Sequence, residues 1–398
     1  MDLSASAMEA VRKRHKVSGR KGRKDFYRYL KDRYNLSTGT TFIESCQLRR
    51  RLPKKKFTLG VVVGPSGSGK TSTLRLFHPA QTAHMRPKAG RPLMQYFPTP
   101  SRAERMLAAV ALNNILDWMQ PFDKLSGGQQ FRASLALALD RWKQSSHYLV
   151  IDEFCSYVDD VTSKAISFRF QKHLRREGCT GVVLATLKPQ LLPYLRPDWV
   201  LYTDATRCAV ERPRWPAIRL KIAMTHITGN VVTVWKRFRQ YHYLSHSFGT
   251  GAKCFLVRCN GEVCGFHASL RHMQPDNIIF AHRTVILPEY QGFGIGPAVH
   301  CLMGSYVRMC DKGLRFRIIT SHVNMIESMK RKPKWWKEQY SNVKRKLKDE
   351  FYRRDKRMLT NFEYIGPKYK GKVVRLWRNN HAKPKNPDLT LKITLTYR

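Results

Sequence analysis

One short segment of this sequence has the residue types that hold a phosphorylated ligand. Three glycines, a lysine and a threonine lie close together in Gly64-Pro65-Ser66-Gly67-Ser68-Gly69-Lys70-Thr71. Glycines let consecutive backbone N–H groups turn toward one phosphate at the positive end of a helix. In such a loop Lys70 reaches the β- and γ-phosphates, and the Thr71 hydroxyl ligates magnesium. The segment, with Ser72 following in the first helical turn, predicts a site for ATP and Mg²⁺.

A pair of carboxylates provides the other groups that ATP chemistry needs. Asp152 and Glu153 end the apolar run Tyr148-Leu149-Val150-Ile151. Asp152 suits a role beside magnesium, and Glu153 is placed to polarise an attacking water. Magnesium is therefore expected near Thr71 and Asp152.

These groups must be positioned by strands and helices, and the sequence between residues 57 and 210 alternates the two patterns. The apolar run Leu59-Gly60-Val61-Val62-Val63 precedes the phosphate loop, and a helical pattern follows it. Such alternation is typical of an α/β domain.

A pair of adjacent glycines farther along the chain lies in a motif that resembles the signature of a known family. Leu125-Ser126-Gly127-Gly128-Gln129-Gln130 runs into a helical pattern and resembles the LSGGQ signature of the ABC ATPases, a likeness that covers residues 57 to 205. The resemblance implies that Ser126, Gly127, Gly128 and Gln129 contact the γ-phosphate held by another copy of the domain. It also implies that Gln95 senses magnesium and that Ser156-Tyr157-Val158-Asp159 is the D-loop.

The sequence departs from this family at one position with consequences for hydrolysis. Leu187 stands where the family usually has a histidine after Val182-Val183-Leu184-Ala185-Thr186, so slow turnover is expected. Each chain has one phosphate loop and one signature, so two composite sites require a homodimer. The stretch between Thr71 and Leu125 is short for a transporter subunit.

Another glycine-rich loop lies farther along. It is Gln291-Gly292-Phe293-Gly294-Ile295-Gly296, after the expected strand 278–287 and before a helical pattern. It resembles the acyl-CoA pyrophosphate loop of the GNAT acetyltransferases. The hairpin expected over 253–270, with Asn260-Gly261 at its turn, and the strand 316–321 fit that family's order over residues 217–335. The resemblance implies binding of acetyl-CoA or another acyl-CoA.

The chemistry of that family is attack of an amine on a thioester, which needs a group to accept a proton. Three side chains are candidates: His242, His322 and Glu289, with His246 beside the first. Any single one of these histidines is more often a structural residue of the core or surface.

The charge of the chain favours a polyanionic partner. Its 398 residues include 73 Lys+Arg against 28 Asp+Glu, a net charge of +45. Such a charge attracts nucleic acid. Aromatic residues among the cations of the tail, Trp335 and Trp336 first, are expected to stack on bases. No apolar run reaches the roughly 18 residues of a membrane helix. The nine cysteines lack a regular framework, so a cytoplasmic protein that is not in the membrane is expected.

The expected fold class is α/β, with an ABC-type ATPase domain before a GNAT-like acyltransferase domain and basic extensions at both ends. The domain ranges are 1–56 for the leader, 57–210 for the ATPase, 217–335 for the acyltransferase and 336–398 for the tail. The two halves resemble ABC-type ATPases fused to an acetyltransferase domain, and the Tyr241–His246 cluster resembles Mom-type acyltransferases that modify DNA bases. The function expected is acylation of a base amine in DNA or RNA. Two alternatives stay open: a non-enzymatic DNA-binding clamp and an acetyltransferase of proteins or small amines.

Overall fold

The computed structural model describes residues 56–77, 87, 90–142, 148–203, 208–242, 249, 251–272, 277–340, 359–371, 374, 376–377 and 389–397. All of them belong to one compact unit, Arg49–Arg398. His246 lies outside the described residues, as do almost all of the leader expected over 1–56 and residues 341–358 of the tail.

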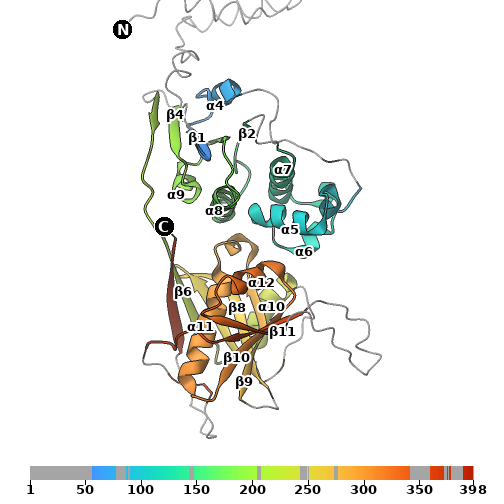
Figure 1. Ribbon diagram of the computed structural model, residues 1–398, viewed down its shortest axis with the longest axis vertical. Helices are drawn as coiled ribbons and strands as arrows, with labels where there is room; N and C mark the ends of the chain where they lie inside the picture. The colour runs from blue at the N-terminus through green and yellow to red at the C-terminus, as the bar shows by residue number, and fades with distance from the viewer. Residues whose placement is uncertain are drawn as a thin grey trace, which may run out of the picture. The chain divides into compact units, whose positions relative to one another are not determined.

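The first half is built on a five-stranded sheet in the order β2-β3-β1-β4-β5 (Figure 1). The first four strands in this order run parallel to their neighbours, and β5 is antiparallel to β4. Every residue of β1 is buried, as expected for a parallel strand covered on both faces. The strands are β1 (Leu59–Val63), β2 (Leu149–Ile151), β3 (Val182–Thr186), β4 (Trp199–Thr203) and β5 (Cys208–Glu211).

The helices of this half connect these strands and fill the segment between the phosphate loop and β2. The α-helices are α4 (Lys70–Leu74), α5 (Pro100–Ala109), α6 (Ile115–Trp118), α7 (Gly127–Arg141), α8 (Asp160–Arg176) and α9 (Leu192–Leu195). Short 3₁₀ helices are η1 (Arg75–Phe77), η2 (Leu93–Tyr96), η3 (Phe122–Lys124) and η4 (Pro189–Leu191). A strand, a glycine loop and a helix follow one another at β1 and α4, so this half has the α/β P-loop arrangement that the sequence predicted.

The second half is built on an eight-stranded sheet in the order β11-β12-β10-β9-β8-β7-β6-β13. Neighbouring strands are antiparallel except β9 and β10, which are parallel. The strands are β6 (Ile218–His226), β7 (Lys253–Cys259), β8 (Glu262–Arg271), β9 (Ile278–Ile286), β10 (Arg315–Thr320), β11 (Trp336–Tyr340), β12 (Thr360–Tyr364) and β13 (Thr390–Tyr397). The helical segments are α10 (Val231–Phe238), η5 (Arg239–Tyr241), η6 (Pro288–Tyr290), α11 (Ile295–Cys310) and α12 (Val323–Lys330).

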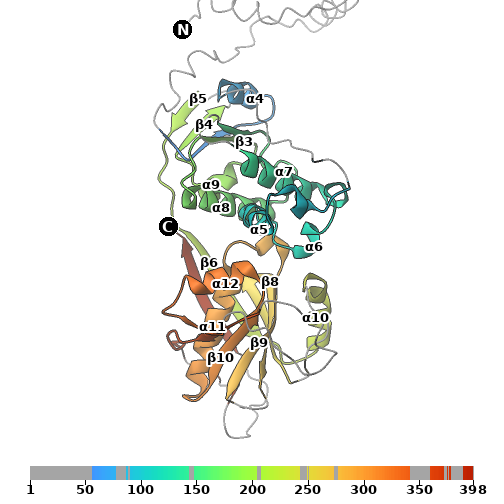
Figure 2. The same ribbon diagram turned by 45° about the vertical axis from the view of Figure 1, so that its right-hand side comes forward.

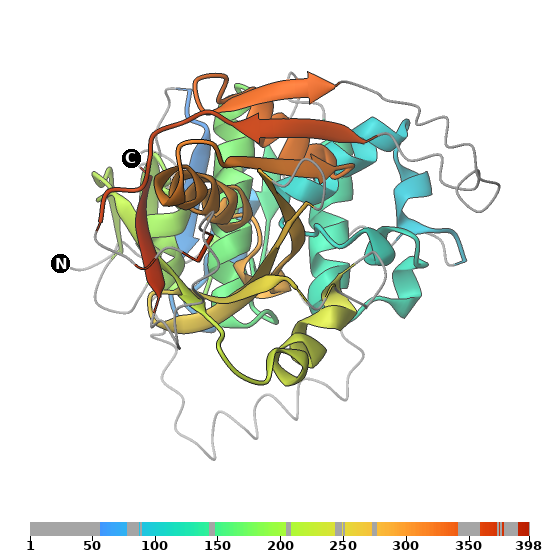
Figure 3. The ribbon, with the colours of Figure 1, turned by 90° about the horizontal axis from the view of Figure 1, so that it is seen from below.

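Two of these helices cover opposite faces of the sheet (Figure 2). Successive side chains of a strand point to opposite faces. In β8, Phe266 packs with Trp235 of α10, their ring centroids 5.1 Å apart. The next residue, His267, meets His300 of α11 at 5.5 Å. The sheet therefore lies between α10 and α11, as Figure 3 also shows.

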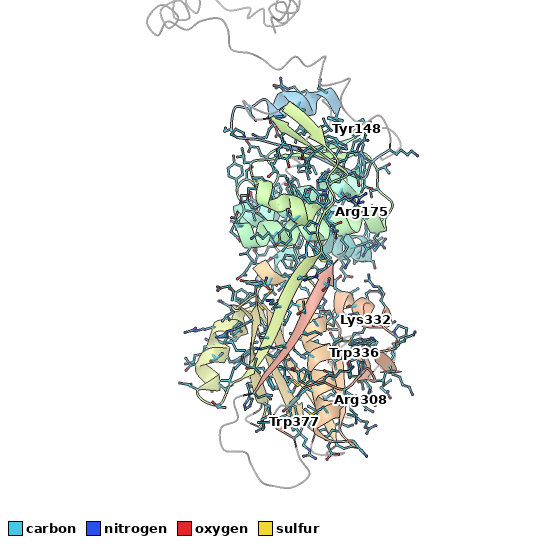
Figure 4. The ribbon with its side chains drawn as sticks, turned by 90° about the vertical axis from the view of Figure 1, so that its left-hand side faces the viewer. Tyr148, Arg175, Arg308, Lys332, Trp336 and Trp377 are labelled. Carbon is cyan, nitrogen blue, oxygen red and sulfur yellow. The ribbon has the colours of Figure 1, made fainter. Side chains whose placement is uncertain are left out.

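The end of the chain is part of this sheet. The sequence placed residues 336–398 in an extension, whereas β11, β12 and β13 supply three of the eight strands. β13 pairs antiparallel with β6 along its whole length, from Thr390 opposite Thr225 to Tyr397 opposite Ile218 (Figure 4). The second domain consequently extends beyond the expected limit of residue 335.

Aromatic side chains join the second glycine loop to helix α8. The ring of Phe293, in the loop, lies 5.4 Å from that of Phe168 on α8 and 6.2 Å from that of Tyr194. Tyr397, at the end of β13, contacts Phe168 at 4.6 Å and donates a hydrogen bond to the Phe293 carbonyl oxygen. Both halves thus share one apolar core.

Candidate functional site

The first glycine loop turns between β1 and α4 through backbone that favours glycine. Gly69 has a φ of 86° and forms the N-cap of α4 without any side-chain hydrogen bond. The loop is braced by the hydroxyls of Ser68 and Thr203, which lie 2.9 Å apart. The start of α4 therefore presents backbone N–H groups to a bound anion.

The side chains predicted to act on phosphate and magnesium meet at this loop. Thr71 Oγ1 donates a 2.6 Å hydrogen bond to Asp152 Oδ2, although 81 positions separate them in the chain. The Lys70 ammonium donates to the Pro65 carbonyl oxygen at 2.5 Å. Burial lowers the pKa of Lys70, and the carboxylates of Asp152 and Glu153 act in the opposite direction. Glu153 follows Asp152 with a φ of 50°.

This donor set fits magnesium and a nucleotide. Mg²⁺ prefers oxygen ligands and usually binds through one or two protein groups together with phosphate oxygens. A hydroxyl and a carboxylate in direct contact, Thr71 and Asp152, provide such oxygens. Lys70 would hold the phosphates, and Glu153 lies beside the same site.

The predicted signature begins helix α7. Ser126 is its N-cap, with its backbone N–H donating to Gln129 Oε1 at 2.8 Å and its hydroxyl accepting from the Gln129 N–H at 3.4 Å. This capping box fixes the first turn while leaving Ser126 and Gly127 exposed. A helix start that is rigid and exposed is suited to an anion supplied by another molecule.

Two other positions implied by the ABC resemblance are also exposed. Gln95 lies in η2, and its role at magnesium stays a prediction. Leu187 follows β3 with 43% of its surface exposed. Its neighbour Lys188 donates hydrogen bonds to the Val158 carbonyl oxygen at 2.6 Å and to Asp160 Oδ1 at 2.9 Å. Lys188 thus ties the end of β3 to the expected D-loop, a contact that the sequence did not reveal.

A cavity of about 1260 Å³ lies beside the second glycine loop. It opens where β9 and β10 part, because their pairing stops at Phe280 opposite Arg317. The residues of β9 and β10 that line it all lie beyond this point: Ala281, His282, Thr284, Val285, Ile286, Ile318, Ile319 and Thr320. The diverging strands therefore shape the cavity.

Strand β9 carries a bulge at the cavity. Ala268 of β8 pairs with Arg283, whereas the next residue, Ser269, pairs with Ala281, so His282 is an extra residue. The extra residue of a bulge is left out of the ladder, and bulges occur beside active sites. The His282 carbonyl oxygen accepts a 2.9 Å hydrogen bond from Arg283 Nη1.

The second glycine loop forms one wall and leads into α11. Gln291 anchors it by donating a 2.8 Å hydrogen bond to the Ile286 carbonyl oxygen. Gly294 is the N-cap of α11, with a φ of 74° and no side-chain cap. The predicted residues Gln291 to Gly296 all line the cavity.

The structure brings together two of the three predicted candidates for the proton acceptor. His242 and His322 both line the cavity, whereas Glu289 does not. His322 Nδ1 is buried without a hydrogen-bond partner, and burial lowers the pKa of this histidine below 6.5. Burial thus favours the neutral, proton-accepting form of His322, although a backbone hydrogen bond acts in the opposite direction.

Other residues at the cavity were missed from the sequence. His282 and His300 line it, as do Arg169 and Lys172 of α8. His282 Nε2 already accepts a hydrogen bond from the Gly249 N–H at 3.1 Å. Burial lowers the pKa of His300 to about 3. The only sequence signal was local: His282 lies in the strand that precedes the glycine loop.

The expectation that Trp336 stacks on bases is wrong. Its ring is buried, with 4% of the residue exposed, and lies 5.2 Å from the ring of Tyr364. Trp335 also packs on Tyr364, at 6.2 Å. Strand β11 begins at Trp336 and pairs with β12, so these aromatics belong to the core of the second sheet.

Comparison with known proteins gives partial structural likenesses. No family model matches this sequence. No curated protein matches it either. A dimeric bacterial ABC transporter cassette is 18% identical, with a TM-score of 0.33, over 41% of this chain and 88% of the cassette. Two further structures are 21% identical to this chain, over 38% of its residues and 37% of theirs. One is the complex of archaeal ribosomal stalk protein aP1 and archaeal ribosome recycling factor aABCE1, with a TM-score of 0.30. The other is RNase-L inhibitor, with a TM-score of 0.29. Within the described part of the chain, no helix is long and apolar enough to cross a bilayer.

Proposed function

We propose that the first half binds Mg²⁺-ATP and that two copies of the chain pair through it. The contact between Thr71 and Asp152 beside Lys70 supports the magnesium and phosphate roles. The exposed, capped start of α7 at Ser126 supports a composite site, because its free N–H groups suit a phosphate on the partner copy. Leu187 in place of the family's histidine makes hydrolysis slow.

We propose further that the second half is an acyl-CoA-dependent N-acyltransferase that modifies a base amine of DNA or RNA. The observation that carries this proposal is the cavity itself, which lies between the parting strands β9 and β10 at the start of α11. Acyl-CoA supplies an activated thioester when it is bound. In this proposal the backbone N–H of His282, the extra residue of the bulge, would stabilise the developing oxyanion.

His322 is favoured as the proton acceptor over His282 and His300, two other histidines of the cavity. Its Nδ1 has no partner, whereas His282 Nε2 is already hydrogen-bonded. His300 has a pKa of about 3, too low for an efficient base near pH 7. A base works in its neutral form, so the rate should fall only when the pH drops through the lowered pKa of His322, below 6.5.

The nucleic-acid substrate is supported by the charge of +45. A base in a duplex must be exposed before its amine can react, which gives an attached ATPase a purpose. The test is to incubate the protein with acetyl-CoA, ATP and DNA or RNA, and to analyse the nucleosides by mass spectrometry. An acylated nucleoside that disappears in His322→Gln and persists in His272→Gln, outside the cavity, supports the proposal.

The alternative is a non-enzymatic clamp, and one contact favours it. Phe293 of the glycine loop is buried against α8, with 5% of its surface exposed. If that packing replaces ligand binding, ATP-dependent nucleic-acid binding persists while no acyl-CoA binds. Calorimetry with acetyl-CoA separates the two functions.

A further inference from the structure

Helix α8 belongs to the first half of the protein, which is proposed to bind nucleotide. The C-terminal part of this helix nevertheless lines the cavity beside the second glycine loop. Three cations come from α8, and two follow the end of α12. We call these five residues the cation cluster: Arg169, Lys172, Arg176, Arg331 and Lys332. Lys332 is labelled in Figure 4.

The cation cluster has little neutralisation from the protein. Three acidic residues also line the cavity: Glu104, Glu177 and Glu327. Among the described residues, Glu177 makes the cluster's single ion pair, at 2.9 Å from Arg176. Burial and the other four cations all lower the pKa of Lys172. Five cations that converge with a single ion pair among them favour an anionic ligand.

One member of the cluster is held firmly against the glycine loop. Arg169 Nε donates a 3.0 Å hydrogen bond to the Ala108 carbonyl oxygen. A Cβ atom built on Gly292 would lie 2.6 Å from Arg169 Cγ, so only glycine permits this approach. Burial and neighbouring cations lower the pKa of Arg169 to about 10, and it stays charged at pH 7. The stem of Arg169 therefore lies against Gly292, two residues before the N-cap of α11, while its Nε is directed to α5.

The cavity also has a polar group with no charge. His300 lines it from α11 with 2% of its surface exposed, and its Nδ1 has no hydrogen-bond partner. Because burial holds its pKa near 3, the ring is neutral at pH 7. Cations and a neutral hydrogen-bonding group thus line the same cavity.

We propose that α8 of the nucleotide-binding half supplies part of the phosphate site for an acyl-CoA-class ligand, so that neither half alone forms the complete site. This inference rests on the proposed acyltransferase function. Such a ligand carries a diphosphate and a third phosphate at one end, which match the cation cluster and the start of α11. Its neutral, amide-containing arm matches a cavity wall that includes an uncharged residue, His300.

The test is calorimetry on the full chain with coenzyme A and with dephospho-coenzyme A, which lacks the third phosphate. The test variant is the double substitution Lys172→Gln and Lys332→Gln. The matched control is the double substitution Lys164→Gln and Lys221→Gln, which removes two positive charges at positions that do not line the cavity. Arg331→Gln is a second variant, at an exposed position that does not threaten folding. The loss of two phosphate contacts should weaken the binding of coenzyme A by about tenfold or more. The binding of dephospho-coenzyme A should weaken by a smaller factor.

The outcomes separate this inference from the proposed function. If coenzyme A binds wild type, the cluster variants and the control equally, the contribution of α8 is overturned and the acyltransferase proposal stands. If neither compound binds wild type, both are overturned. If the cluster variants lose affinity for a single-stranded oligonucleotide but not for coenzyme A, the cations serve nucleic acid, and this inference is overturned.

Discussion

The Thr71 hydroxyl donates a 2.6 Å hydrogen bond to a carboxylate oxygen of Asp152. The contact joins the first turn of α4 to the end of β2, two elements far apart in the sequence. Glu153 follows directly, and Lys70 lies in the same turn as Thr71. The side chains suited to magnesium, phosphate and water thus converge at one loop.

We expect Lys70→Ala to abolish tight binding of Mg²⁺-ATP. The substitution removes a cation held among carboxylates and phosphates, and a charge-assisted hydrogen bond is worth about 1.5–3 kcal/mol. A loss near the upper value is roughly a hundredfold in affinity. Titration with a fluorescent ATP analogue measures it, with Lys56→Ala, exposed before β1, as the control. Equal affinity of wild type and Lys70→Ala would rule out the assigned loop.

We expect Glu153→Gln to form an ATP-dependent homodimer. Without its carboxylate the site should retain unhydrolysed nucleotide, and the retained γ-phosphate should hold the signature of the partner copy. Sedimentation velocity with and without ATP measures the association. Ser126→Asp in the same background is the control, since aspartate still caps a helix but repels a phosphate. A monomer at saturating ATP would contradict the composite site.

We expect Leu187→His to accelerate ATP hydrolysis. The ABC resemblance implies a histidine at this position, and a positioned acid–base group contributes at least about a hundredfold where its geometry is right. Because the new side chain enters a site not built for it, an increase of about tenfold is the expected result. Leu187 is 43% exposed, so the exchange should not disturb the core. Phosphate release is the measurement, with Leu187→Gln as control, and an unchanged rate would show that slow turnover has another cause.

Local signals predicted the elements around both glycine loops. The Asn260-Gly261 turn was expected to join two strands, and it does: both residues have positive φ, 51° and 98°, and β7 pairs with β8. The helices after the loops were also confirmed, at α4 and α11. Such features depend on a few adjacent residues, so they can be predicted directly from the sequence.

Long-range partners were not predictable in this way. Strand β13 alternates buried and exposed positions, with Leu391 facing inward and Lys392 outward. Its sequence thus has a strand pattern, but nothing in it specifies β6 as the partner, and its basic composition is typical of a tail. The cation cluster depends on the same kind of information, because Lys172 and Lys332 meet only when α8 packs against the second glycine loop.

We expect nucleic-acid binding to weaken steeply with salt. Each neutralised phosphate of duplex DNA releases counterions and adds roughly −0.9 to the slope of log affinity against log salt. Fluorescence anisotropy with a labelled duplex and a labelled single strand, at salt concentrations of about 50 to 200 mM, measures the slope for each. The charge of +45 predicts several phosphate contacts. A flat dependence would show that the basic residues serve another purpose.

We expect Gly294→Asp to eliminate acyl-CoA binding while leaving ATP binding intact. Gly294 has a φ of 74° at the start of α11, and a Cβ atom there would lie 3.2 Å from the Tyr397 hydroxyl oxygen. Aspartate would add strain, bulk and a negative charge where phosphates are expected to bind. Gly261→Asp is the matched control, because it adds the same charge at another positive φ, 98°, in the open turn between β7 and β8.

Calorimetry with acetyl-CoA, on wild type and both variants, is the direct measurement. ATP binding should survive in all three proteins, since Gly64–Thr71 lies on other elements, and it reports that each variant is folded. Binding of acetyl-CoA to wild type and Gly261→Asp, but not to Gly294→Asp, supports the assigned loop. If Gly294→Asp binds acetyl-CoA as tightly as wild type does, the phosphates do not lie at the start of α11. If wild type itself binds no acyl-CoA, the clamp replaces the acyltransferase as the better account of the second half.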